Sequence, residues 1–248
     1  DVVGELVAVL SGKGGTGKTS VCAAIATALA DADLSVLCID CDIGLRNLDI
    51  SLALSHEAPL SFLDVCQGGY GLEQATTHPQ FPTLSFLTAP VNCQPEDVDK
   101  LAFRRMLSQA RAMYDYVFLD APAGVDAGFR LVSAAADKFI LVTGSGPAAV
   151  RDAARVGELL ELAGKTDVRL VVNRVDKTML SILKTTIDDV MDSAGLPLLG
   201  VVLEDPDVPL SAACGQSLVT YNRRSSAAKS FQRIAKRIQG YPEPIKIR

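Results

Sequence analysis

The chain has 248 residues, a mean hydropathy of +0.25 and a formal net charge of −5. This acidic balance argues against a broad electrostatic surface for DNA or RNA, so we expect no nucleic acid partner. No run of about 18 apolar residues occurs, which excludes a membrane-spanning helix, and six cysteines scattered through apolar stretches are typical of reduced thiols in a cytoplasmic protein.

Short apolar runs alternate with stretches of helical periodicity along the chain. Strands are predicted at 5–10, 35–40, 84–87, 116–120, 139–143, 169–173 and 198–203, and helices at 19–30, 96–112, 148–162, 180–193 and 225–239. Continuous apolar runs indicate strands that are buried on both faces. We therefore expect one α/β domain over residues 1–248, a doubly wound, mostly parallel sheet with helices on both faces.

A glycine-rich loop follows the first predicted strand. Residues 12–19 read G-K-G-G-T-G-K-T and satisfy the phosphate-loop pattern G-x-x-x-x-G-K-[ST], which predicts a P-loop nucleotide hydrolase. Backbone N–H groups of such a loop surround phosphate oxygens, Lys18 is expected to bridge the β- and γ-phosphates, and Thr19 to bind Mg²⁺. The predicted nucleotide-binding residues here are Gly14, Gly15, Thr16, Gly17, Lys18, Thr19 and Ser20.

Acidic residues end two of the predicted strands. Asp40 and Asp42 follow the second strand, where we expect Asp40 to face the water shell of Mg²⁺ and Asp42 the attacking water. The other interpretation of this pair is a solvated acidic strand end. Asp120 ends the strand at 116–120 and is predicted to hold Mg²⁺ through a water, and the turn at 121–124 is small enough to report on the γ-phosphate.

The residues at the end of the strand at 169–173 bear on whether the nucleotide carries adenine or guanine. Asn173-Arg174-Val175-Asp176 is close to the N-K-x-D pattern with which GTPases read guanine, since an aspartate accepts two hydrogen bonds from that base. On these residues alone, ATP and GTP both remain open.

Two segments resemble the MinD family of deviant Walker A ATPases, within the MinD/ParA group. The phosphate loop carries an extra lysine, Lys13, and residues 40–49 read D-C-D-I-G-L-R-N-L-D; the likeness continues through 120–124, 149–152 and 200–205. The resemblance implies an ATP-hydrolysing, Mg²⁺-dependent switch that forms a homodimer in the ATP state. It also implies recruitment of a MinC-like division inhibitor at the inner face of the cell membrane, and release by a MinE-like or other topology factor.

The resemblance also assigns individual residues. Lys13 is expected to reach the nucleotide of a second copy and to act in catalysis with Lys18 and Asp42. Asn173 and Arg174 are expected to contact adenine, which favours ATP. The residues assigned to dimer or partner contacts are Lys13, Asn47, Arg151 and Asp152.

Some features depart from the family or point elsewhere. The family's amphipathic lipid-binding tail has no convincing counterpart here, so contact with an anionic membrane depends on a native tail. The stretch 225–239 has an apolar stripe flanked by cations and could lie on a membrane, but we expect it to cover the sheet. One alternative function is that of a flagellar-number regulator of the same fold. Another is that of an iron–sulfur carrier, which the C-x-x-C motif Cys38-Ile39-Asp40-Cys41 suggests. A tyrosine kinase is disfavoured because the carboxyl end has no tyrosine cluster.

Overall fold

The computed structural model describes residues 2–54, 59–183 and 187–245. Within them one sheet contains the strands β1 (Glu5–Leu10), β2 (Val36–Asp40), β3 (Thr76–Thr77), β4 (Leu84–Leu87), β5 (Tyr116–Asp120), β6 (Lys138–Thr143), β7 (Asp167–Val175) and β8 (Leu198–Leu203). Their order is β3-β4-β2-β5-β1-β6-β7-β8, and every pairing is parallel except that of β3 with β4. All seven strands predicted from the sequence are confirmed within two residues.

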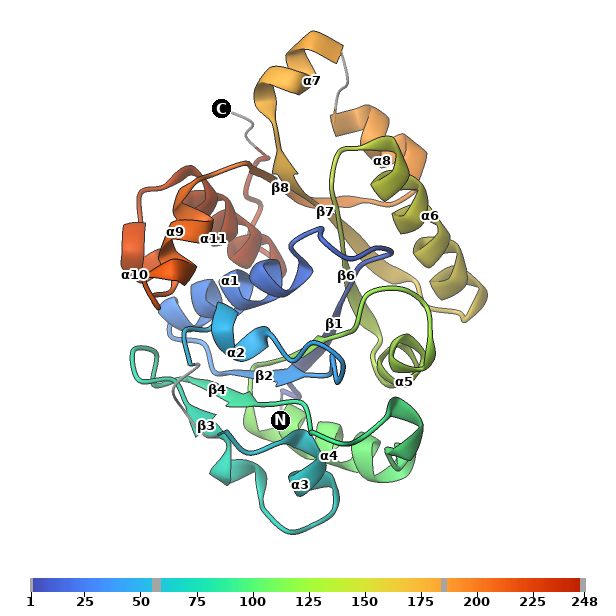
Figure 1. Ribbon diagram of the computed structural model, residues 1–248, viewed down its shortest axis with the longest axis vertical. Helices are drawn as coiled ribbons and strands as arrows, with labels where there is room; N and C mark the ends of the chain where they lie inside the picture. Colours follow the sequence, from blue (N-terminus) through green and yellow to red (C-terminus); the bar gives the residue numbers. More distant parts are fainter. Residues whose placement is uncertain (1, 55–58, 184–186, 246–248) are drawn as a thin grey trace.

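Helices cover both faces of this sheet (Figure 1). They are α1 (Lys18–Asp31), α2 (Leu48–Ser51), α3 (Phe62–Cys66), α4 (Lys100–Met113), α5 (Ala127–Ala135), α6 (Pro147–Leu162), α7 (Lys177–Leu183), α8 (Ile187–Ala194), α9 (Asp207–Ala213), α10 (Leu218–Asn222) and α11 (Ser226–Ile238). None of the helices in the described part of the chain combines the length and apolar content needed to cross a bilayer.

Successive side chains along each strand point to opposite faces of the sheet, which divides the core into two layers. Leu6, Ala8 and Leu10 of β1 pack in one layer with α3, α4, α5 and α6, and Val7 and Val9 pack in the other with α1, α2 and α11. The doubly wound α/β fold expected from the sequence is confirmed. Its central strands place their carboxyl ends beside the amino end of α1, where ligands bind in such sheets.

One predicted helix differs from the structure at its start. The helix expected at 96–112 begins only at Lys100, because residues Pro95–Asp97 form a 3-10 turn and the Asp99 carboxylate accepts hydrogen bonds from Leu101 N and Ala102 N. The helix predicted at 180–193 is confirmed over the described residues 180–183, in α7, and 187–193, in α8; residues 184–186 lie outside the described part.

The last helix, α11, covers the sheet as expected. Phe231, Ile234, Ala235 and Ile238 are buried in the layer that contains α1, and the helix packs on α1 and β8. Its apolar stripe is therefore used inside the domain, which contradicts the alternative that this stripe lies in a membrane surface.

Candidate functional site

The phosphate loop forms an open cradle between β1 and α1. Gly15 and Gly17 have φ values of +81° and +80°, in the left-handed region that favours glycine, and a side chain at Gly14 or Gly15 would meet open space. Among the residues that the structure describes, no side chain caps the amino end of α1. Within the same residues, the buried hydroxyl oxygens of Ser11 and Thr16 have no hydrogen-bond partner. A helix amino end with two such hydroxyls beside it is chemistry that fits an anion such as a phosphate chain.

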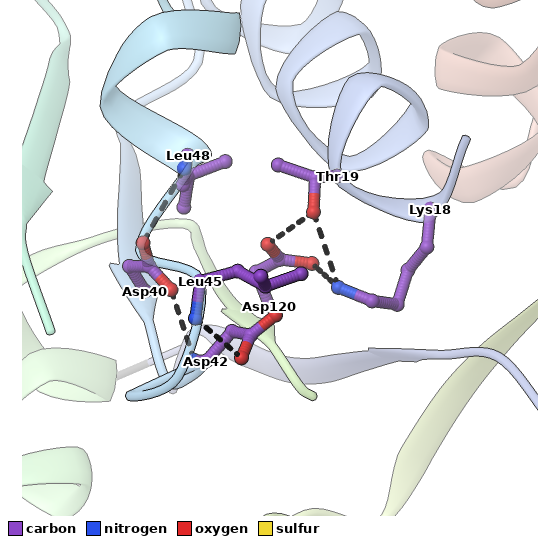
Figure 2. Close-up of polar contacts among 7 residues, drawn as sticks. All are labelled: Lys18, Thr19, Asp40, Asp42, Leu45, Leu48 and Asp120. Atoms are coloured by element: carbon purple, nitrogen blue, oxygen red, sulfur yellow. Dashed lines mark hydrogen bonds and ion pairs between the residues drawn. The ribbon is translucent and has the colours of Figure 1, made fainter. Parts of the chain in front are cut away.

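Lys18, Thr19 and Asp120 meet at the base of this cradle (Figure 2). The Lys18 ammonium forms a buried ion pair with Asp120 Oδ1 and also donates to Thr19 Oγ1 at 3.2 Å. The Thr19 hydroxyl donates to Asp120 Oδ2 at 2.9 Å. Burial raises the pKa of Asp120, and the Lys18 ammonium and both hydrogen bonds oppose that rise. The loop lysine is thus held by the acid at the end of β5.

Asp40 lies beside Asp120 on the same face of the sheet. The two residues are in register on neighbouring parallel strands, so their side chains point together toward α1. Burial, followed by the negative charge of Asp120, raises the pKa of Asp40 to about 7. Its oxygens accept hydrogen bonds from Asp42 N at 2.9 Å and Leu48 N at 3.3 Å. Besides its predicted place near Mg²⁺, Asp40 therefore anchors both ends of the segment 42–48, a contact that the sequence motif does not reveal.

The donor set fits a magnesium ion held partly by phosphate. Mg²⁺ prefers oxygen ligands and is usually bound by one or two carboxylates together with substrate phosphates. Asp40, Asp120 and the Thr19 hydroxyl supply such oxygens next to the open cradle.

The segment after β2 is a compact loop built on Asp42. Asp42 is 8% exposed, its Oδ1 accepts from Leu45 N at 3.3 Å, and its carbonyl accepts from Arg46 N at 2.9 Å. Arg46 adopts the left-handed conformation, with φ at +54°, and its Nε donates to Ala89 O. Asn47 is exposed at the start of α2. The segment 42–48 therefore has a defined shape that is held by hydrogen bonds of Asp40 and Asp42.

The turn after β5 lies directly alongside the phosphate loop. Ala121 N donates to Val9 O, and Gly124 N donates to Ser11 O, both at 3.1 Å. A cavity of about 790 Å³ separates this turn from the loop at 42–44, and Asp42 and Pro122 are among its lining residues. The segment after β2 and the turn after β5 thus share one cavity.

A second pocket, of about 300 Å³, adjoins the amino end of α1. It is bounded by Gly17, Val21, Asn173, Arg174, the end of β8 and α9. The pairing of β7 with β8 is irregular between Val172 and Val175, as at a β-bulge. Asn173, 6% exposed, donates through Nδ2 to Thr16 O at 2.9 Å, and Arg174 donates to Gly15 O. The residues that the resemblance assigns to the base therefore line a pocket and contact the phosphate loop.

The acids near this pocket have distinct tasks. Asp176 Oδ1 accepts from Thr178 N and Met179 N and so caps α7, away from the lining of the pocket. Asp205 accepts from Asp207 N at 2.9 Å and Ala227 N at 2.8 Å, which fixes the starts of α9 and α11. Asp205 was not singled out from the sequence for a site. Its position just after a strand's carboxyl end is the signal that could have found it.

The remaining predicted residues lie around the cradle. Lys13 and Arg151 are exposed, and Asp152 is half-buried. The backbone of Asp152 packs so closely on the phosphate loop that a Cβ at Gly12 would lie 2.5 Å from its carbonyl. The helix that carries Arg151 and Asp152 is therefore in direct contact with the loop.

Cys38 and Cys41 do not converge. Cys38 is buried in the core layer with α1, and Cys41 in the layer on the opposite face with α4 and α5. Burial also raises the pKa of the Cys41 thiol. This arrangement does not favour the iron–sulfur interpretation of the C-x-x-C segment.

Comparisons with known proteins agree with this geometry. Residues 7–219 match the family model of the CobQ/CobB/MinD/ParA nucleotide binding domain. The septum site-determining protein MinD of Synechocystis sp. is 34% identical over 97% of this chain and 91% of its own. The MinC:MinD cell division protein complex of Aquifex aeolicus matches with a TM-score of 0.90 and 31% identity, over 98% of both chains. MinD complexed with Mg-ADP from Pyrococcus horikoshii matches with a TM-score of 0.80 and 26% identity, over 94% of this chain and 95% of that chain.

Proposed function

The chain belongs to the MinD family within the CobQ/CobB/MinD/ParA nucleotide-binding group, and on that premise we propose that it is a Mg²⁺-dependent ATPase that dimerises with ATP and regulates where the cell divides. We further propose that residues 1–248 act as one P-loop ATPase domain. The observation that carries the proposal is the open phosphate cradle, with the Lys18–Asp120 pair and with two buried hydroxyls that have no partner among the described residues.

We propose that a bound nucleotide replaces contacts that the side chains of the site make with one another, such as the Lys18–Asp120 ion pair. The ammonium of Lys18 would exchange Asp120 for the β- and γ-phosphates, while N–H groups of residues 14–20 and the Thr16 hydroxyl donate to phosphate oxygens. Thr19, Asp40 and Asp120 are the residues proposed to hold Mg²⁺. When bound, that ion would neutralise charge that develops on the phosphates.

Adenine is the base that the second pocket favours. A guanine site needs a carboxylate that can accept two hydrogen bonds. Asp176, the aspartate of the guanine-reading pattern, caps α7 instead and is not among the residues that line the pocket. Asn173 has both a donor and an acceptor and lies at the pocket's phosphate side, so we propose ATP and ADP as ligands, with Asn173 and Arg174 at the base.

Hydrolysis is proposed to depend on Asp42 and on a second copy of the chain. Asp42 lines the cavity between the segment after β2 and the turn after β5, where its carboxylate would orient the attacking water. Lys13 is exposed, as is required of a side chain that is proposed to reach the nucleotide of another protomer. Asn47, also exposed, is proposed to face that protomer.

The partners are proposed from the relatives. The likeness to a MinC:MinD complex supports a MinC-like inhibitor, for which Arg151 and Asp152 on α6 are the proposed contacts. A MinE-like or other topology factor would stimulate hydrolysis. We propose that the ATP-bound dimer is peripheral on the inner face of the cell membrane, through a native tail that binds anionic lipid, and that the ADP-bound protein is cytoplasmic.

One comparison tests this function directly. ATP hydrolysis is measured with and without anionic vesicles and a candidate MinE-like protein, for the native chain, Asp42→Asn and Lys13→Ala. Asp42→Asn is expected to bind Mg-ATP and to lose hydrolysis about a hundredfold or more. Asp126→Asn is the matched control, because Asp126 is an exposed acid on the same cavity whose side chain makes no capping bond. No affinity of the native chain for Mg-ATP, or normal activated turnover of either site variant, contradicts the proposal.

A further inference from the structure

An ion pair stands at the rim of the base pocket. Arg174, at the end of β7, and Glu204, just after β8, lie with Nε and Oε2 3.5 Å apart, and both line the pocket. Their side chains are 59% and 56% exposed. An ion pair this exposed stabilises a fold very little, so its contribution to stability does not explain it.

The backbone at Arg174 is held in an unfavourable conformation. Its φ is +54°, in the left-handed region, and it lies in the irregular stretch between Val172 and Val175. A non-glycine residue in this region costs about 1 kcal/mol or more, and bulges beside active sites turn side chains out of the regular alternation. The consequence here is that Asn173 points to Thr16 while the next side chain, Arg174, also reaches the phosphate loop.

Two interactions fix the position of the Arg174 guanidinium. Its Nη1 donates a hydrogen bond to Gly15 O at 3.3 Å, and its Nε forms the ion pair with Glu204. The same pocket also has apolar lining, from Val208, Pro209 and Phe231. A flat aromatic ligand between an apolar wall and a guanidinium is stabilised on both faces, because arginine stacks on aromatic rings.

We propose that Glu204 is a positioning residue for adenine recognition, which holds Arg174 over the pocket so that its guanidinium stacks on the base. The proposal rests on the ATP-binding function above and deepens it. Glu204 itself would not touch the phosphates. Its loss should therefore weaken only the part of the affinity that depends on the base.

The experiment compares a nucleotide with a ligand that has no base. Affinities of the full chain for Mg-ATP and for Mg-tripolyphosphate are measured by calorimetry for the native protein, Glu204→Gln and Arg174→Lys. Glu204→Gln is expected to bind Mg-ATP about two- to fivefold more weakly, the range of an exposed cation–π contact, and tripolyphosphate as the native chain does. Arg174→Lys keeps the charge but loses the planar group, and is expected to lose the same ATP-specific part.

Glu5→Gln is the matched control, since it removes the carboxylate of another partly exposed pair, with Lys138, at the start of β1. It should bind both ligands normally. Native-like ATP affinity of Glu204→Gln overturns the inference, and so does an equal loss for both ligands, which would mean that the pair acts on the phosphate loop. If the native chain binds tripolyphosphate as tightly as ATP, the base makes no contribution and the positioning role fails. If it binds neither ligand, the proposed function fails first.

Discussion

The contact between Gly17 and Asn173 gives a prediction whose size follows from the structure. A Cβ on Gly17 would lie 2.4 Å from Asn173 Nδ2, and the backbone there has a φ of +80°. Asn173 is buried and donates to Thr16 O, so it cannot move away without losing that bond. Backbone strain of about 1–2 kcal/mol and a lost hydrogen bond of about 1 kcal/mol together predict that Gly17→Ala lowers the free energy of unfolding by about 2–3 kcal/mol.

Urea unfolding of the nucleotide-free protein measures this change, and Gly164→Ala supplies the control. Gly164 has a φ of +76° with nothing within reach of an added Cβ, so it reports the backbone strain alone. The double variant Gly17→Ala/Asn173→Ala relieves the clash and should be destabilised by less than the sum of its parts. If Gly17→Ala costs no more than Gly164→Ala, the close contact with Asn173 does not exist as described.

Three further predictions concern other contacts. Asp176→Ala should remove the cap of α7, at about 1 kcal/mol, and leave the ratio of ATP to GTP affinity unchanged; a shift of that ratio in a binding assay contradicts the capping role. Burial lowers the pKa of His78, so the unfolded chain takes up the proton first and stability present at neutral pH is lost as the pH falls below about 6.5. His78→Gln should show a smaller loss between pH 7.5 and 5.5 in urea midpoints. Ile234→Ala should cost about 2–5 kcal/mol, since this side chain is fully buried, and a thermal melt with a negligible shift argues against α11 as a core helix.

Much of the fold was predictable because its strands are buried on both faces. β1 and β5 read as unbroken apolar runs, and their bounds agree with the prediction to the residue. Short elements lacked such a signal. α2 and α3 have four and five residues, too few for a helical period to repeat, although the capping box of Ser61 with Asp64 marks the start of α3.

The candidate site was predictable where a motif fixes the backbone. Lys18, Thr19, Asp40 and Asp120 do lie together, as expected when parallel strands and a phosphate loop end at one edge. The contacts that these side chains make with one another were not predictable, because an ion pair such as Lys18 with Asp120 joins residues 102 positions apart. Periodicity and local motifs carry no information on such contacts.

The Lys18–Asp120 pair has a consequence for the order in which ligands arrive. Each charge neutralises the other in a nearly dry place, so removing either one alone strands its counterpart at a cost of several kcal/mol. A phosphate chain without its metal would attract the Lys18 ammonium and leave the Asp120 carboxylate without a counter-charge. A metal ion without phosphate would bind Asp120 and leave the Lys18 ammonium without one. If the cation and the anion bind together, Lys18 and Asp120 each gain a new partner of opposite charge, and neither charge is left unpaired. Under the proposed function, a phosphate chain that arrives together with its magnesium ion would therefore be favoured over either part alone.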